Sequence, residues 1–239
     1  MKQALVTGGT KGIGLAVTKM LLAEGYAVTV TFAHDKEQAN AVYKEFTQKG
    51  LKLDVFHAAQ GNKEHVHSLV KHMRAKGYVD CIICNAGTTE RSRLIDTTDE
   101  AWERVMQINV NSNMSLIRDL YEIIAPNARI VFMGSMMGVL PHSVSLAYGV
   151  SKAAEIALAK NLVKEFAGTG TTVNVIAPGF VNTDWQKTKS DKIRQNICNK
   201  TALGRFADPD EIAEAVRFCV KNAFINGSII EIHGGYNYQ

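Results

Sequence analysis

The sequence lacks any long apolar run, and no stretch approaches the roughly 18 apolar residues of a membrane-spanning helix. Its first residues, MKQALVTGG, lack the apolar core and the cleavage site of a signal peptide. The net charge is only +4, and no run of Lys and Arg concentrates it. We therefore expect a cytoplasmic protein that acts neither at a membrane nor on nucleic acid.

Cysteine is scarce as well, since the chain has only four. Two of them, Cys81 and Cys84, have the C-x-x-C spacing of a redox pair or of half a zinc site. They lie in YVDCIICNAG, an apolar run typical of a buried strand, and residues three apart on a strand point to opposite faces. Two buried structural cysteines are therefore the favoured interpretation. The seven histidines also lack metal-ligand spacing, so no metal site is predicted.

Strand patterns and helix patterns alternate along the chain, without a repeat, a linker or a low-complexity tract. The predicted strands are Lys2–Thr7, Ala27–Phe32, Leu51–His57, Val79–Asn85, Arg129–Gly134, Thr171–Ala177 and Ser228–His233. The predicted helices are one that ends at Gly25, then Lys36–Lys49, Lys63–Lys76, Asp99–Ala125, Ala147–Ala167 and Pro209–Lys221, while Gly179–Arg205 is expected to be irregular. This alternation predicts an α/β fold, a Rossmann-like doubly wound parallel sheet in a single domain over residues 1–239.

A glycine-rich loop, TGGTKGIG, follows the first predicted strand and opens the first helix, with Gly8, Gly12 and Gly14 at its turns. Glycine lets the backbone approach a pyrophosphate, which then meets the free N–H groups of the helix N-terminus. The spacing differs from the usual G-x-G-x-x-G. Its place between a strand and a helix nevertheless favours dinucleotide binding.

Several motifs, taken in order, resemble the short-chain dehydrogenase/reductase family over essentially the whole chain. They are TGGTKGIG, Asn85-Ala86-Gly87, Asn109, Ser135, Tyr148-x-x-x-Lys152 and Pro178-Gly179-x-x-x-Thr183. The strings TVNVIAPGF and LGRF, with the C-terminal I-x-GG, are similar to the 3-oxoacyl-[acyl-carrier-protein] reductase branch. The resemblance implies cofactor contacts from Gly8, Thr10, Lys11, Gly12, Ile13, Gly14, Asn85, Ala86, Gly87, Tyr148, Lys152, Pro178, Gly179 and Thr183.

The same resemblance implies catalytic roles for four residues. Tyr148 would donate the proton that a carbonyl oxygen needs once hydride reaches its carbon. Lys152 would bind the cofactor ribose, and its ammonium, one helical turn away, stabilises a phenolate. Ser135 would bind the carbonyl, and Asn109 would hold a water molecule in a proton relay. Alone, Tyr-x-x-x-Lys also fits an ordinary surface pair on a helix, but the complete set favours catalysis.

The residue at the end of the second strand helps to decide between NAD and NADP, because NAD enzymes of this fold carry an acidic residue there. Phe32 stands there, so a 2′-phosphate is not repelled, and Lys11 or, more weakly, His34 can supply positive charge. We therefore expect NADP(H). The adenine contacts are open, because the family's Asp-Val pair aligns with Ala59-Gln60, although Asp54 lies upstream and a register shift is possible.

The predicted reaction is reduction of a ketone to a secondary alcohol, with a 3-oxoacyl thioester as the favoured substrate. The alternatives are another small ketone, such as a sugar, a quinone or a metabolite, and a non-catalytic NADP-binding regulator. Acyl carrier protein is a possible partner, although Ala125-Pro126-Asn127 and Gly168-Thr169-Gly170 lack the expected basic residues and only Lys164 and Arg129 remain. The stretch Phe180–Arg205 suits a substrate lid, in which Trp185 packs on substrate or on the core. Ala153, Ala154 and Ala157 suggest a partner subunit, and the family analogy a homotetramer.

Overall fold

The computed structural model describes residues 1–142, 145–236 and 238. Among them, seven strands form one sheet in the order β3-β2-β1-β4-β5-β6-β7, and every neighbouring pair is parallel. The strands are β1 (Gln3–Val6), β2 (Ala27–Phe32), β3 (Leu53–His57), β4 (Val79–Cys84), β5 (Ile124–Met133), β6 (Thr172–Pro178) and β7 (Ile229–Ile232). The predicted doubly wound parallel fold is confirmed.

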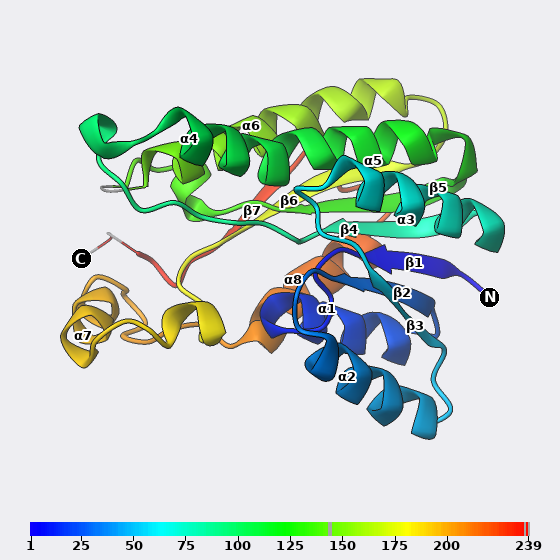
Figure 1. Cartoon of the computed structure of the whole chain (residues 1–239), viewed down its shortest axis with the longest axis horizontal. Coiled ribbons are helices and arrows are strands. Elements are labelled where there is room, and N and C mark those ends of the chain that lie inside the picture. Colours follow the sequence, from blue (N-terminus) through cyan, green and yellow to red (C-terminus); the bar gives the residue numbers. More distant parts are fainter. Residues whose placement is uncertain (143–144, 237, 239) are drawn as a thin grey trace.

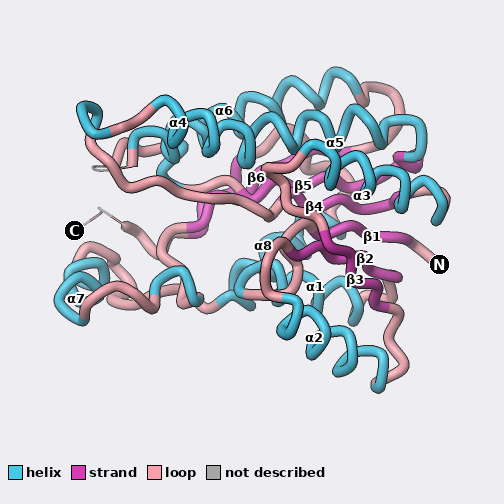
Figure 2. The backbone as a smooth tube through the Cα atoms, in the orientation of Figure 1, coloured by secondary structure: helices cyan, strands magenta, loops and turns pink. Residues whose placement is uncertain are grey.

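Helices cover both faces of this sheet (Figure 1). One layer contains α1 (Gly12–Ala23), α2 (Lys36–Gln48) and α8 (Pro209–Lys221), and the other contains α3 (Lys63–Lys76), α4 (Asp99–Met106), α5 (Ser112–Leu120) and α6 (Leu146–Glu165). Helix α1 packs on α8, α3 on α5, and α4 on α6. A last helix, α7 (Asp191–Asn199), stands apart from both layers, off one end of the sheet (Figure 2).

The two faces of the sheet carry separate apolar cores because successive strand residues alternate between them. On β4, Cys81 and Ile83 pack in the core beneath α1 and α8, whereas Ile82 and Cys84 pack in the core beneath α3, α5 and α6. The predicted divergence of the two cysteines is confirmed. Burial raises the pKa of the Cys81 thiol to about 12, so its reactive thiolate is suppressed.

No helix within the described ranges is long and apolar enough to cross a membrane. Over the same ranges, no three Cys, His, Asp or Glu side chains come together as a potential metal site.

Two sequence-based assignments are wrong. The predicted helix Asp99–Ala125 is broken by a π-helical turn, Gln107–Asn111, and β5 already begins at Ile124, which pairs with Val79 before the register shifts. The segment Gly179–Arg205 is not irregular throughout, because it contains the short helix Asp184–Gln186 and α7. Only Ile197 of α7 is buried, so the polar sequence of this helix lacks the apolar period from which a helix is predicted.

The parallel strands bring their carboxyl ends to one edge of the sheet. Gly8 follows β1, Asn85 follows β4, Ser135 follows β5 and Gly179 follows β6. The chain leaves β1 toward β2 and returns across it to β4, so the strand order reverses between these two central strands. Ligands of open α/β sheets bind at such a reversal point.

Candidate active site

The glycine loop after β1 folds tightly against the end of β4. Gly8 has a φ of +65°, which favours glycine, and a Cβ atom at Gly14 would lie 2.2 Å from the Gly8 carbonyl oxygen. The Asn85 Nδ2 atom donates to the Thr7 carbonyl oxygen at 2.8 Å and to that of Gly8 at 3.2 Å. These contacts fix the loop and leave the N-terminus of α1 open to a ligand.

A cleft of about 420 Å³ runs along this edge of the sheet. It brings together most of the predicted cofactor residues, namely Gly8, Lys11, Gly12, Ile13, Gly14, Asn85, Ala86, Gly87, Tyr148, Lys152, Pro178, Gly179 and Thr183. Two others lie elsewhere. His34 lines an adjoining cavity that also touches Gly8, Ala86 and Gly87, while Thr10 is buried and its carbonyl oxygen accepts from Gln38.

Ala59 and Gln60 line that adjoining cavity with Ala33 and His34. The Gln60 side chain is buried, and neither of its amide atoms has a hydrogen-bond partner among the described residues. Asp54 lies apart from this cavity and pairs with His72 at 2.6 Å and Lys76 at 2.8 Å. The structure therefore favours the Ala59-Gln60 alignment. It also adds Gln60 as a candidate contact that the sequence alone left open.

Lys11 forms an ion pair with Asp35, the N-cap of α2. This ion pair and the Gln38 N–H hold the pKa of the Asp35 carboxyl below its ordinary value. A carboxylate thus lies three residues beyond Phe32, just past the strand end at which the sequence shows no acidic residue.

Ser135 and Tyr148 come from adjoining elements. Ser135 follows β5 and caps the short helix Met136–Gly138, where its Oγ atom accepts from the Met137 N–H at 3.1 Å. Tyr148 lies in the first turn of α6, which packs on that short helix. Because the Oγ atom is an acceptor in this bond, its hydroxyl hydrogen remains able to donate.

Lys152 lies behind Tyr148 and is almost wholly buried. Its Nζ atom donates to the Met133 carbonyl oxygen at 2.8 Å and forms an ion pair with Glu155 Oε2 at 2.6 Å. The other Glu155 oxygen accepts from Asn113 Nδ2 at 2.9 Å. Sequence reasoning missed Glu155 and Asn113, although an acidic residue three positions after Lys152 in an apolar helix was a visible signal.

The buried pair of Lys152 and Glu155 is electrostatically coupled. Burial alone would lower the pKa of Lys152, but the Glu155 carboxylate and Tyr148 raise it above its ordinary value. Burial raises the pKa of Glu155 to about 7, while Lys152 and Asn113 pull it down. Lys152 therefore stays an ammonium, with a partner that titrates near neutral pH.

Asn109 lies in the π-helical turn, fully buried beneath this pair. Its Oδ1 atom accepts from the Thr88 N–H at 2.8 Å, and its Nδ2 atom donates to the Thr88 carbonyl oxygen and the Ser151 hydroxyl, each at 2.9 Å. Asn109 lines neither the cofactor cleft nor the adjoining cavity, and its side-chain amide is already used in these bonds. A relay water would therefore need its main-chain oxygen, which accepts from Asn113 at 2.7 Å.

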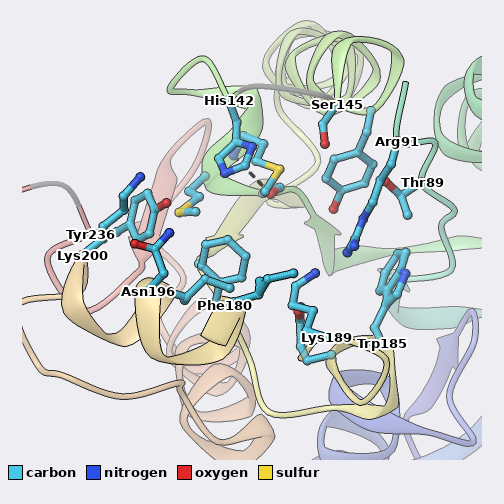
Figure 3. A pocket seen from close by; sticks show the side chains of 18 residues that line it. Thr89, Arg91, His142, Ser145, Phe180, Trp185, Lys189, Asn196, Lys200 and Tyr236 are labelled. Atoms are coloured by element: carbon cyan, nitrogen blue, oxygen red, sulfur yellow. Dashed lines mark hydrogen bonds between the residues drawn. The ribbon is translucent and has the colours of Figure 1, made fainter. Parts of the chain in front are cut away.

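Figure 3 shows a second cavity, of about 350 Å³. Ser135 and Tyr148 line both this cavity and the cofactor cleft, so the two meet there. Its walls include Phe180, Trp185 and Lys189 from the segment after β6, and Ile193 and Asn196 from α7. The Trp185 ring lies edge-on to the Tyr148 ring, 6.4 Å between centroids, and is half exposed. Trp185 thus faces the two clefts rather than the core.

Comparison with known proteins identifies the family. The family model described as "Enoyl-(Acyl carrier protein) reductase" matches residues 8–237. The 3-oxoacyl-[acyl-carrier-protein] reductase FabG of Escherichia coli (strain K12) is 34% identical, over 98% of this chain and 96% of its own.

Solved structures share the overall fold. A dehydrogenase/reductase from Sinorhizobium meliloti 1021 has a TM-score of 0.92 and 31% identity, covering 98% of this chain and 94% of its own. A short-chain dehydrogenase from Burkholderia cenocepacia J2315 in complex with NADP has a TM-score of 0.92 and 28% identity, with 98% and 97% covered. The chain therefore belongs to the short-chain dehydrogenase/reductase family, whose members are oxidoreductases.

Proposed function

We propose that this protein reduces a ketone to a secondary alcohol with NADPH, and that its substrate is a 3-oxoacyl thioester. The observation that carries the proposal is the junction of the two cavities, where Ser135 and Tyr148 line both. A carbonyl at this junction meets the cofactor cleft on one side and two hydroxyl groups on the other. The bound nicotinamide would supply hydride to the carbonyl carbon.

The chain's own groups manage the proton. Ser135 donates a hydrogen bond to the carbonyl oxygen, and Tyr148 transfers its phenolic proton to that oxygen as the alkoxide forms. The Lys152 ammonium, with Nζ 5.7 Å from the centre of the Tyr148 ring, stabilises the resulting phenolate. The Met133 carbonyl oxygen accepts from one of its three N–H groups, and Glu155 pairs with its charge, so a ribose hydroxyl can accept from another N–H group.

The residues of the cofactor cleft fit a dinucleotide phosphate. Any side chain at Gly14 would collide with the Gly8 backbone, and the loop opens on the N-terminus of α1, which favours anions. Lys11 lines the cleft beside Ala33, where it can exchange Asp35 for a 2′-phosphate. NADP bound to the Burkholderia cenocepacia relative supports NADP(H) over NAD(H).

The name of the Escherichia coli relative supports a 3-oxoacyl thioester as substrate. Delivery by acyl carrier protein remains a prediction, as does a cytoplasmic location. Arg129, one of two cations considered for carrier docking, instead donates to the main-chain oxygens of Asn127, Ala128 and Val220. Lys164 is exposed on α6 and is still available for docking.

The test is NADPH oxidation with acetoacetyl thioesters, free and carrier-bound, beside unrelated ketones. Wild type should reduce a thioester, and Tyr148→Phe should lose at least about 10³-fold in kcat, because the variant lacks the phenolic proton that is transferred to the alkoxide. NADPH affinity should hold within about threefold. The control is Tyr43→Phe, at an exposed tyrosine on α2. Turnover retained by Tyr148→Phe would refute the assignment.

A further inference from the structure

The second cavity has a charge imbalance that the reaction at its floor does not explain. Three cationic side chains line it, Arg91, Lys189 and Lys200, and no Asp or Glu does so among the described residues. The whole chain is nearly balanced, with 27 basic and 23 acidic residues. A pocket lined by one sign of charge attracts ligands of the opposite sign.

Arg91 and Lys189 face each other across this cavity. Arg91 comes from the loop after β4 and Lys189 from the segment before α7, and Figure 3 shows their side chains extending toward one another beside Trp185. Neither forms an ion pair with any residue that the structure describes. Partial burial, together with the nearby Arg91, lowers the pKa of Lys189. Two cations held together without a counter-charge favour an anion between them.

Neighbouring cations in the same two segments are neutralised. Arg93 pairs with Asp96 at 3.3 Å, and Lys187 pairs with Asp184. Neither Arg93 nor Lys187 lines the cavity. The unpaired cations of these segments are therefore the two that face it.

We propose that Arg91 and Lys189 bind an oxyanion, a carboxylate or a phosphate, on the non-reacting part of the ketone substrate. This inference rests on the proposed function, because it assigns the substrate of the same site. The planar guanidinium of Arg91 can make two parallel bonds to such a group, and Lys189 adds a point charge. Neither residue lines the cofactor cleft, so the cofactor's own phosphates are not the anion.

The test compares matched charged and neutral substrates with saturating NADPH. Acetoacetate against its ethyl ester probes a carboxylate, and acetoacetyl phosphopantetheine against acetoacetyl pantetheine probes a phosphate. Arg91→Met and Lys189→Met should each raise KM for one charged substrate at least about tenfold, and leave its neutral partner within twofold. Arg93→Met and Lys187→Met are the controls, and should change neither.

The pair that responds identifies the anion as carboxylate or phosphate. Equal effects on charged and neutral substrates, or no effect on either, would overturn the subsite while leaving the proposed function intact.

Calorimetric titration tests the anion subsite even where the proposed reductase activity fails. If no ketone is reduced, acetoacetate and phosphopantetheine are titrated into the NADPH-bound protein. Binding that is lost in the Arg91→Met/Lys189→Met double variant would uphold the anion subsite and reject the reductase. Absence of binding to wild type would reject the subsite too.

Discussion

At the scale of single residues, the buried pair of Lys152 and Glu155 holds the lysine in place behind Tyr148. An ion pair removed from water is held by its partners, since either charge alone would be costly to bury. Asn113 and the Met133 carbonyl oxygen provide those partners. Glu155 thus fixes the Nζ atom of Lys152 and, when ionised, offsets part of its positive charge.

Glu155 also makes stability depend on pH. Burial raises its pKa from 4.5 to about 7, so between these values the folded protein holds a proton that the unfolded chain has lost. The free energy of unfolding therefore falls as pH rises from about 4.5 to 7, by an amount of order 1–3 kcal/mol. Glu155→Gln should remove this fall. Urea unfolding midpoints of wild type and variant at pH 5 and pH 8 would measure this fall. An equal change in the midpoint of both proteins would contradict its assignment to Glu155.

The sequence predicted the identity of the reacting side chains but not their supports. Ser135, Tyr148 and Lys152 lie at motif spacings that are visible in one dimension. The contacts of Glu155 with Asn113, and of Asn109 with Thr88, join residues from different elements. Such pairs are known only once the loop after β4, the π-helical turn, α5 and α6 have been placed in space. The Lys11–Asp35 ion pair escaped prediction for the same reason.

At the scale of elements, the contact between the short helix Met136–Gly138 and α6 sets the geometry of the site. A Cβ atom at Gly138 would lie 2.6 Å from the Lys152 main-chain carbon and 2.8 Å from the Ala153 nitrogen. Both contacts are to backbone, which cannot rotate away as a side chain can. Ser135 begins the short helix and Tyr148 belongs to α6, so separating the elements separates the two hydroxyl groups.

Gly138→Ala should therefore lower kcat by about 10- to 100-fold, the scale expected for a misplacement near 1 Å. The comparison variant is Gly149→Ala in the same interface, where the Cβ atom would lie 3.2 Å from the Met137 oxygen. It should have a smaller effect. Thermal unfolding and NADPH binding would show that both variants are folded. A wild-type kcat in Gly138→Ala would mean that the interface does not position the hydroxyl groups.

Elements with a regular apolar period were predicted within about two residues, among them β2, α3 and α8. The failures have physical causes. The apolar pattern before β5 is helical throughout and gives no sign of the π-helical turn. The first residues of β5 show no strand pattern, because the backbone is irregular there: Asn127 has a φ of +61°. Helix α7 buries little, so burial imposes little pattern on its sequence.

At the scale of the whole molecule, α6 presents an uncovered strip of apolar and small residues. Leu146, Val150, Ala153 and Ala157 follow one another at helical spacing, and all are exposed in the single chain. Monomeric proteins seldom leave such a strip in water. A second copy packed on α6 through a two-fold axis, the commonest symmetry of oligomers, would cover this strip. Such packing would fit the homotetramer that the family resemblance implies.

Ala157→Arg should then break the assembly into smaller species without unfolding the chain, because the added side chain cannot fit a close helix contact. Sedimentation velocity would show the change as a lower molecular mass. Asn40→Arg, at an exposed position on α2, is the control and should leave the mass unchanged. A monomeric wild type, or an unaltered mass in Ala157→Arg, would contradict this interface.

The return of the chain from β3 to β4 also determines the order in which the parts of the site become available during synthesis. Ala4 on β1 pairs with Cys81 on β4, so the first strand waits for more than 70 further residues before its inner neighbour is synthesised. The far side of the site comes later still, with Ser135 and Gly179 after β5 and β6. Synthesis proceeds at about 5–20 residues per second. Many seconds therefore pass between synthesis of the glycine loop and synthesis of the residues that complete the dinucleotide site.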